Sequence, residues 1–434
     1  MAPVTESTGA STALLTDHYE LTMLQAALEG GAAQRRSVFE LFPRRLPGGR
    51  RYGVVAGVGR ALDAIEAFRF DDVTLAALDG VVDDRTLTWL AGYRFHGDVW
   101  GYPEGEAYFP QSPLAIVEST FAEAVLLETV LLSIYNHDSA VASAASRMTL
   151  AADGRPCIEM GSRRTHEEAA VAAARAAYVA GFGSTSNLAA RARYGVPSAG
   201  TSAHSFTLLH DTEEQAFRAQ VESLGKGTTL LVDTYDIAEA VRLGVEVAGP
   251  ELGAVRIDSG DLGVLAVAVR EQLDELGAKD TRIIVTSDLD EYAIAALAAA
   301  PVDGYGVGTQ LVTGSGHPTC GFVYKLVARE GEDGELVSVA KKSADKVSVG
   351  GRKYALRRRD RRGRAEAEVI GIGTPPVDDG DDRPLLVPLV RDGEIVGREP
   401  LEAARERHVA SRDELPITVR SMAKGDPAIP TIFV

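Results

Sequence analysis

The chain has 434 residues, of which 45% are hydrophobic and 25% charged, and its formal net charge is −17 at pH 7. This composition is typical of a folded globular protein with two or three domains. So acidic a chain is a poor general binder of nucleic acid or anionic membranes. Its two cysteines, Cys157 and Cys320, exclude a disulfide framework and a cysteine-rich metal site. No signal-peptide pattern begins the sequence and no apolar run approaches ~20 residues, so we expect a cytoplasmic protein that does not span a membrane.

The first third of the chain mixes helical and strand patterns. Residues 17–28 are predicted to form a helix, with Thr16 or Asp17 as its N-cap. The other elements expected here are a strand over residues 37–43, short strands over residues 98–120, and helices over residues 121–134 and 139–151.

From Cys157 onward the sequence repeats one unit, in which a short apolar run ends in a polar cluster and a helical stretch follows. The runs and their clusters are CIEM with GSRRTH, SAGT with SAHSF, TTLLV with DTYD, AVRI with DSGDL, RIIV with TSDLD, and DGYGV with GTQLV. Repeated β-α units predict parallel strands joined by crossover helices, in a barrel or an open sheet. In both architectures the residues that follow the strands meet at one edge, where such enzymes place their sites.

After about residue 326 the repeat stops, and we expect a β-rich tail that packs on the N-terminal segment. LLVPLV, DGE and IVG predict a hairpin. Residues 341–364 are strongly basic, and the acidic segment PPVDDGDDRP follows at 375–384. The run RRRDRRGR has no interleaved aromatic residues, so a solvated hairpin or pairing with the protein's own acids is favoured over nucleic-acid binding.

The segment VRIDSGDL places Arg256, Asp258 and Asp261 just after a predicted strand. Carboxylates there suit ribose hydroxyls or a Mg²⁺ ion bound to a diphosphate, and an arginine can bind a carboxylate or a phosphate through two donors. The alternative is structural, with an aspartate or serine as the cap of the next helix and Arg256 in a surface ion pair.

Two further clusters offer other chemistry. The glycines of DGYGVGT, with Thr309 after them, would let backbone N–H groups approach a phosphate, although tight turns need the same glycines. Thr201 and His204 lie in GTSAHSF. A histidine there can act as acid, base or nucleophile near neutral pH, or it can be purely structural.

Two further motifs each allow a functional and a structural interpretation. Arg163 and Arg164 in GSRRTH are adjacent cations in an acidic chain, which indicates either an anionic ligand or ion pairs with acids such as Glu159. In DHYELTM, Tyr19 and Thr22 share one face of the predicted helix, which a routine amphipathic helix also explains.

Taken together, these segments resemble the nicotinate phosphoribosyltransferase family. The resemblance runs from LLTDHYELTM and FELFPRRLP through EMGSRR, GFGSTSN, GVPSAGTSAHSF, LLVDTYD, VRIDSGDL and GVGT to GFVYKLV. It implies an irregular parallel α/β barrel with a smaller α+β domain formed from both chain ends. We therefore expect an N-terminal α+β domain at residues 1–113, a catalytic barrel at 114–340, and a β-rich segment at 341–434 that packs on the N-terminal domain.

The resemblance also implies a reaction. Members of the family transfer phosphoribosyl from 5-phosphoribosyl 1-diphosphate to nicotinate, which gives nicotinate mononucleotide and diphosphate for NAD salvage, and they couple this transfer to ATP hydrolysis. The implied cofactor is Mg²⁺, with ATP as a co-substrate. The implied assembly is a homodimer with shared active sites.

Residue roles follow from the resemblance motif by motif. His204 is similar to the histidine that ATP transiently phosphorylates. Thr201, Arg256 and Tyr19 are similar to the contacts of the pyridine carboxylate, with Tyr19 reaching the site of the neighbouring subunit. Arg163 is similar to a substrate-site arginine.

The sugar phosphate has its own set of expected contacts. Asp258 and Asp261 match positions that face the ribose and its metal, and Asp258 joins His204 and Arg256 in the expected catalytic set. The positions that match the loop for the 5′-phosphate are Gly306, Gly308 and Thr309.

Two departures from the family pattern affect the expected contacts: many members have Asp at the position of Gly183, and TH follows EMGSRR where small residues are expected. Three alternatives stay open, namely a relative that uses nicotinamide, a non-catalytic metabolite-binding barrel and a phosphosugar aldolase or isomerase. The third would need a catalytic Lys or Glu at a strand end, whereas Lys325 lies within a strand-like run.

Overall fold

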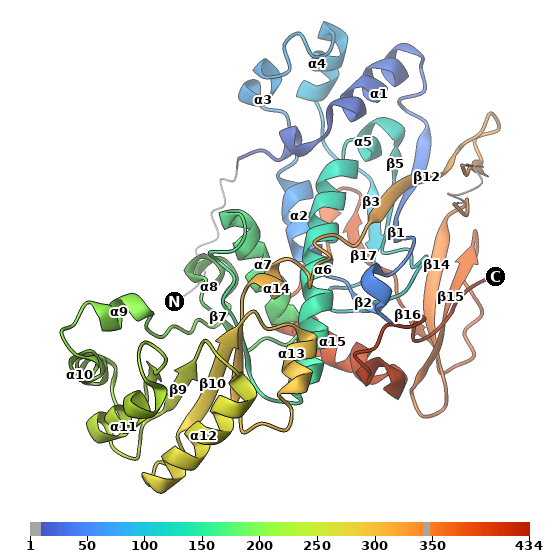
Figure 1. The fold of residues 1–434 in the computed structure, drawn as a ribbon. Coiled ribbons are helices and arrows are strands. Elements are labelled where there is room, and N and C mark those ends of the chain that lie inside the picture. The colour runs from blue at the N-terminus through green and yellow to red at the C-terminus, as the bar shows by residue number, and fades with distance from the viewer. Residues whose placement is uncertain (1–9, 342–347) are drawn as a thin grey trace. The chain divides into compact units, whose positions relative to one another are not determined.

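The computed structural model describes residues 10–341 and 348–434; residues 342–347, within the predicted basic segment, lie outside the described residues, as do the first nine. The chain forms two compact units (Figure 1). Unit 1 comprises Met1–Ser139, Thr319–Val419 and Lys424–Val434, and unit 2 comprises Ala140–Pro318 and Arg420–Ala423. Both chain ends therefore belong to one unit, as expected. Within the described residues, no helix is long and apolar enough to cross a membrane.

Unit 2 is built on a parallel sheet of six strands in the order β7-β6-β11-β10-β9-β8. The strands are β6 (Cys157–Glu159), β7 (Ser184–Thr185), β8 (Thr229–Leu231), β9 (Ala254–Ile257), β10 (Arg282–Ser287) and β11 (Gly304–Val307). No ladder joins β7 to β8 in the described part of the chain, so the sheet is an incomplete, irregular barrel.

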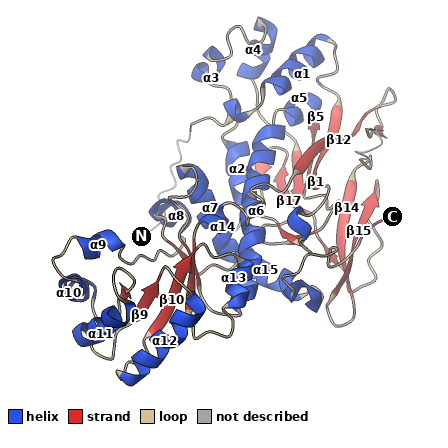
Figure 2. Cartoon of the chain, viewed as in Figure 1, coloured by secondary structure: helices blue, strands red, loops and turns tan. Residues whose placement is uncertain are grey.

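Helices alternate with these strands, as the repeated β-α pattern predicts. They are α7 (Glu167–Val179), α8 (Leu188–Tyr194), α9 (His204–Leu208), α10 (Glu213–Leu224), α11 (Ile237–Ala248), α12 (Leu262–Glu275), α13 (Glu291–Ala296) and α14 (Thr309–Val312). Figure 2 shows α12 lying along β9 and β10. Because helices cover the sheet, the strand residues are mostly buried, which explains why the strands are continuous apolar runs in the sequence.

One predicted strand is wrong. The segment SAGT forms only an isolated bridge, between Ser198 and Thr185, and the two-residue strand β7 occupies the edge of the sheet. Pro197 precedes the bridge and has no N–H group to donate, although its carbonyl accepts from the N–H of Thr185 at 2.9 Å.

Unit 1 contains an antiparallel sheet of seven strands in the order β13-β12-β1-β5-β3-β17-β18, a four-stranded sheet in the order β16-β14-β15-β19, and the pair β2-β4. The strands are β1 (Arg36–Pro43), β2 (Gly53–Val54), β3 (Asp98–Gly101), β4 (Ala107–Tyr108), β5 (Ala115–Thr120), β12 (Phe322–Glu330), β13 (Leu336–Ser338), β14 (Lys353–Arg359), β15 (Ala365–Ile372), β16 (Arg383–Pro384), β17 (Val387–Arg391), β18 (Glu394–Ile395) and β19 (Thr431–Phe433). The β17–β18 pair confirms the predicted hairpin.

The helices of unit 1 agree with the sequence prediction at α1 and differ from it between residues 121 and 151. Their bounds, with α6 continuing into unit 2, are α1 (His18–Glu29), α2 (Val58–Glu66), α3 (Asp72–Ala76), α4 (Asp84–Ala91), α5 (Phe121–Val125), α6 (Glu128–Ala152) and α15 (Leu401–Asp413). Asp17 caps α1 in a capping box with Glu20, as predicted. The predicted helices at 121–134 and 139–151 are instead α5 and the continuous α6, which contains no Gly or Pro to interrupt it.

The two units differ from the predicted domains. The expected boundaries fall at 113/114 and 340/341, whereas the compact units divide at 139/140 and 318/319. The reason is strand pairing, since β5 and β12 both pair with β1 and therefore belong to the sheet of unit 1.

Several cations of the described basic tail pair with the protein's own acids, which is one of the two outcomes favoured above. Arg357 is fully buried and forms ion pairs with Glu368 at 3.1 Å and Glu414 at 3.0 Å. Arg358 pairs with the buried Asp382 at 3.1 Å. These contacts make this part of the tail a structural element of unit 1.

Candidate active site

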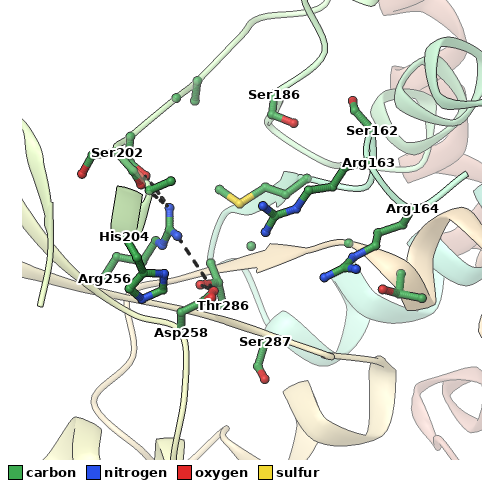
Figure 3. A pocket seen from close by; sticks show the side chains of 18 of the residues that line it. Ser162, Arg163, Arg164, Ser186, Ser202, His204, Arg256, Asp258, Thr286 and Ser287 are labelled. Atoms are coloured by element: carbon green, nitrogen blue, oxygen red, sulfur yellow. Dashed lines mark hydrogen bonds and ion pairs between the residues drawn. The ribbon is translucent and has the colours of Figure 1, made fainter. Parts of the chain in front are cut away.

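The post-strand clusters of unit 2 meet at one cavity of about 490 Å³. Residues that follow β6, β7, β9, β10 and β11 line it, together with the loop that leads into α9. Figure 3 shows His204 and Arg256 on one side of the cavity, Arg163 and Arg164 on the other, and Asp258 between them. The carboxyl ends of parallel strands therefore gather these side chains, as expected of an α/β enzyme.

His204 is the first residue of α9, and its side chain is 40% exposed at the cavity. Its Nε2 atom lies 3.0 Å from Oδ1 of Asp233, whose side chain is only 2% exposed. A carboxylate accepts hydrogen bonds, so this contact places the ring proton on Nε2 and leaves Nδ1 without a proton on the neutral ring.

Asp233 was not among the predicted site residues. Its second oxygen, Oδ2, accepts hydrogen bonds from the backbone N–H of Asp258 at 3.0 Å and from the hydroxyl of Ser259 at 2.7 Å. One buried carboxylate thus fixes both the histidine and the start of the DSGDL segment. The sequence signal was the aspartate that follows strand β8 in LLVDTYD.

Arg256 on β9 extends into the cavity, and its side chain is 12% exposed. Its Nη1 donates to the hydroxyl of Thr201 and to the carbonyl of Ser202, the latter at 3.3 Å, and its Nη2 lies 4.0 Å from Asp258. Burial lowers the pKa of Arg256 from its ordinary value; Asp258 opposes this change and the charge of Arg163 adds to it. Two of the predicted nicotinate contacts, Arg256 and Thr201, therefore touch one another.

Arg163 and Arg164 line the cavity from the loop after β6. Neither has an ion-pair partner among the described residues. Glu159, considered above as a partner, is buried and instead accepts from the Thr185 hydroxyl and the Gly161 N–H, and burial raises its pKa. The two guanidinium groups are thus available to an anionic ligand.

The glycine segment forms part of the cavity wall. A Cβ atom on Gly306 would lie 2.4 Å from a methyl carbon of Thr286 and 2.8 Å from the sulfur of Met160, so the position requires glycine. A Cβ atom on Gly308 would lie 3.3 Å from the carbonyl oxygen of Met160. Thr309 begins α14. All three predicted residues, Gly306, Gly308 and Thr309, line the cavity.

The two predicted metal-site carboxylates are in different places. Asp258 lines the cavity and its Oδ1 accepts from the hydroxyl of Thr286. Asp261 caps α12 by accepting from the N–H of Val264 at 3.2 Å, and it is not part of the cavity wall. Asp288, which follows β10 and was not predicted, does line the cavity.

Two positions of interest lie elsewhere. Tyr19 is on α1 in unit 1 and is 45% exposed; burial of its hydroxyl, with the charges of Glu128 and Glu20, raises its pKa. Gly183 does not line the cavity, and a Cβ atom there would lie 3.8 Å from the Cys157 carbonyl, an ordinary contact. The structure gives no steric reason for glycine at position 183.

Comparison of folds identifies the class. A crystal structure of human nicotinic acid phosphoribosyltransferase matches with a TM-score of 0.82 and 25% identity, covering 97% of each chain. A nicotinate-nucleotide pyrophosphorylase from Pyrococcus furiosus, at 24% identity, shares the fold with a TM-score of 0.76, covering 95% of this chain and 99% of its own. The chain thus has the fold of the class of enzymes to which these two proteins belong.

Sequence comparison narrows the class. Residues 14–136 match the sequence model of the nicotinate phosphoribosyltransferase N-terminal domain. Nicotinate phosphoribosyltransferase pncB1 of Mycobacterium tuberculosis is 58% identical over 427 residues, covering 96% of this chain and 94% of that protein. The Bacillus subtilis nicotinate phosphoribosyltransferase is 38% identical over 361 residues, covering 80% and 73%. The chain belongs to the nicotinate phosphoribosyltransferase family.

Proposed function

We propose that this protein transfers phosphoribosyl from 5-phosphoribosyl 1-diphosphate to nicotinate, giving nicotinate mononucleotide and diphosphate. We further propose that it couples the transfer to ATP hydrolysis through transient phosphorylation of His204. The observation that carries the proposal is the meeting of His204, Arg256 and Asp258 in one cavity, in a chain of this family.

The transfer needs groups that bind anions and hold the ring in line. The C1–O bond to diphosphate breaks with its electron pair leaving on the diphosphate, and the ring nitrogen of nicotinate supplies the pair for the new C1–N bond. Arg256, with Thr201 and the nearby Arg163, would clamp the nicotinate carboxylate and orient the ring. Nicotinamide has no carboxylate and would lose the charge-assisted hydrogen bonds that nicotinate makes with Arg256, at a cost of about 1–3 kcal/mol.

The contact of His204 with Asp233 supports phosphorylation of the ring at Nδ1. The Nε2–H group keeps its proton and donates a hydrogen bond to Asp233, so the Nδ1 lone pair can attack the γ-phosphorus of ATP while the bond to ADP breaks. The ring then carries positive charge, which the buried Asp233 carboxylate stabilises. The new phosphoryl group adds about −1.5 to −2 charges beside Arg256, if it behaves as other protein phosphates do.

A Mg²⁺ ion bound at this cavity would supply positive charge to offset the negative charge of the diphosphate. Carboxylate oxygens are the ligands that it prefers, and Asp258 offers one at the cavity. Asp261 lies in the same segment but is engaged as a helix cap. We propose a homodimer in which Tyr19 of one copy contacts nicotinate in the other; the exposure of Tyr19 and of Leu15 and Met23 near it supports this.

The decisive experiment incubates the protein with nicotinate, 5-phosphoribosyl 1-diphosphate, Mg²⁺ and ATP, and counts both ADP and diphosphate. We expect both products, and little turnover when nicotinamide replaces nicotinate. His204→Ala should lose ATP stimulation while slow ATP-independent turnover persists. His210→Ala, a control whose ring contacts the Phe206 carbonyl and not the cavity, should keep full stimulation. Full stimulation in His204→Ala would refute the role of His204.

A further inference from the structure

Unit 1 contains a second cavity, of about 550 Å³, that the proposed reaction does not use. Trp100 on β3 and Glu118 on β5 line it from the seven-stranded sheet, and Tyr354 on β14 lines it from the four-stranded sheet. Its volume lies within the roughly 300–1,000 Å³ of small-molecule sites, large enough for a base with its sugar.

The walls of this cavity are mostly apolar, and part of them packs on the core. Trp100 and Leu386 pack against a buried cluster that includes Ile116 and Val327, which fixes them. The proline rings that complete the wall are Pro375, Pro376 and Pro384. Such a wall favours a ligand with a flat, weakly hydrated body.

Two arginines stack on the aromatic rings of the cavity. The guanidinium carbon of Arg391 lies 3.8 Å from the ring centre of Trp100, and that of Arg352 lies 4.0 Å from the ring centre of Tyr354. Planar guanidinium groups and aromatic rings are the surfaces on which nucleic-acid bases stack. The side chains thus present several flat surfaces to one cavity.

The charges of these arginines are already balanced. Arg352 donates to Glu118 and Arg391 donates to Asp98, each at 3.0 Å. The cavity of unit 2 differs, because Arg163 and Arg164 have no such partners among the described residues. An anionic ligand that binds through free guanidinium charge therefore suits unit 2 and not unit 1.

One carboxylate of the second cavity has no cationic partner at hydrogen-bond distance in the described structure. Asp378 is exposed, and its Oδ1 accepts from the N–H of Gly380 in its own loop, while the neighbouring Asp382 pairs with Arg358. An N–H donor on a ligand can bind Asp378, whereas a phosphate would be repelled by it. From walls, stacking surfaces and charge together, we propose that this cavity binds an uncharged nucleoside-sized ligand whose heteroaromatic ring carries an amino group.

The test uses the fluorescence of Trp100. The chain has two tryptophans, so Trp89→Phe in the full-length protein leaves Trp100 as the single reporter. Adenosine is the probe, and purine riboside is its matched control because it lacks only the amino group. We expect saturable quenching by adenosine with a dissociation constant below about 1 mM, and binding about tenfold weaker or worse for purine riboside and for AMP.

Two variants locate the binding. Leu386→Trp in the Trp89→Phe background should fill the cavity and abolish adenosine binding measured by calorimetry, while the Trp89→Phe parent still binds. Arg256→Ala should leave adenosine binding unchanged, because that residue lies in the other cavity. The experiment measures binding, so its result does not depend on whether the proposed transferase reaction takes place. No saturable quenching up to about 5 mM adenosine, AMP binding tighter than adenosine, or unchanged binding in the Leu386→Trp variant would overturn the proposal.

Discussion

Replacing Asp233 by Asn tests the arrangement around His204. The side chain is almost completely buried and uses both oxygens, one toward Nε2 of His204 and one toward donors on Asp258 and Ser259. Asparagine has nearly the same shape, and its oxygen can still accept from those two donors. Its amide group would then face Nε2, which would have to accept a hydrogen bond. The ring proton would move to Nδ1, the atom that we propose attacks ATP.

The size of the effect follows from the hydrogen bond that is lost. A hydrogen bond to a charged group contributes about 1.5–3 kcal/mol, which corresponds to about 10- to 150-fold in a rate. We expect phosphorylation of the protein by γ-labelled ATP, followed as acid-labile label in a single turnover, to slow by that factor. ATP-independent turnover should change less than about threefold, because Arg256 and Thr201 keep their contacts.

A control in the same loop separates this effect from a general disturbance. Asp236 caps α11 by accepting from the N–H of Glu239, and asparagine is an equally good cap. Asp236→Asn should therefore be phosphorylated at the wild-type rate, with thermal unfolding checked for both variants. Wild-type labelling of Asp233→Asn, or equal losses of labelling and of ATP-independent turnover, would refute the assigned hydrogen-bond geometry.

Three further predictions concern charged side chains. Arg256→Ala should raise the nicotinate KM at least about tenfold; unchanged KM and kcat would remove Arg256 from the site. Arg164→Ala should raise the KM for 5-phosphoribosyl 1-diphosphate and leave the nicotinate KM within about twofold, with partial recovery in Arg164→Lys; a selective effect on nicotinate would contradict this division. Burial, with the charges of Glu239 and Asp236, raises the pKa of Glu213 to about 7 from 4.5, so folding stability should fall as pH rises from 4.5 through 7. Thermal unfolding against pH should show that Glu213→Gln removes this fall and gains about 1–2 kcal/mol at pH 8, less than the full shift would give because water screens part of the site.

The meeting of the post-strand clusters could be predicted from the sequence, because the carboxyl ends of parallel strands must share one edge. The partner of His204 could not. Asp233 is 29 residues away along the chain, and its contact depends on where the start of α9 lies relative to the end of β8. Asp261 shows a different limit, because an aspartate after a strand can face a ligand or cap the next helix. Only the backbone geometry separates the two possibilities.

The ligand preferences that we propose for the two cavities rest on local ion pairing and not on net charge. At physiological salt, charges separated by more than about 8 Å on the surface are largely screened, so the −17 charge of the chain acts weakly inside a cavity. What a ligand meets is the local remainder after ion pairs have formed. That remainder is the cations Arg163 and Arg164, offset in part by the carboxylate Asp288, in unit 2, and the carboxylate Asp378 in unit 1. The two proposals, a sugar diphosphate in one cavity and discrimination against phosphate in a second cavity that has two stacked arginines, are therefore compatible in one acidic protein.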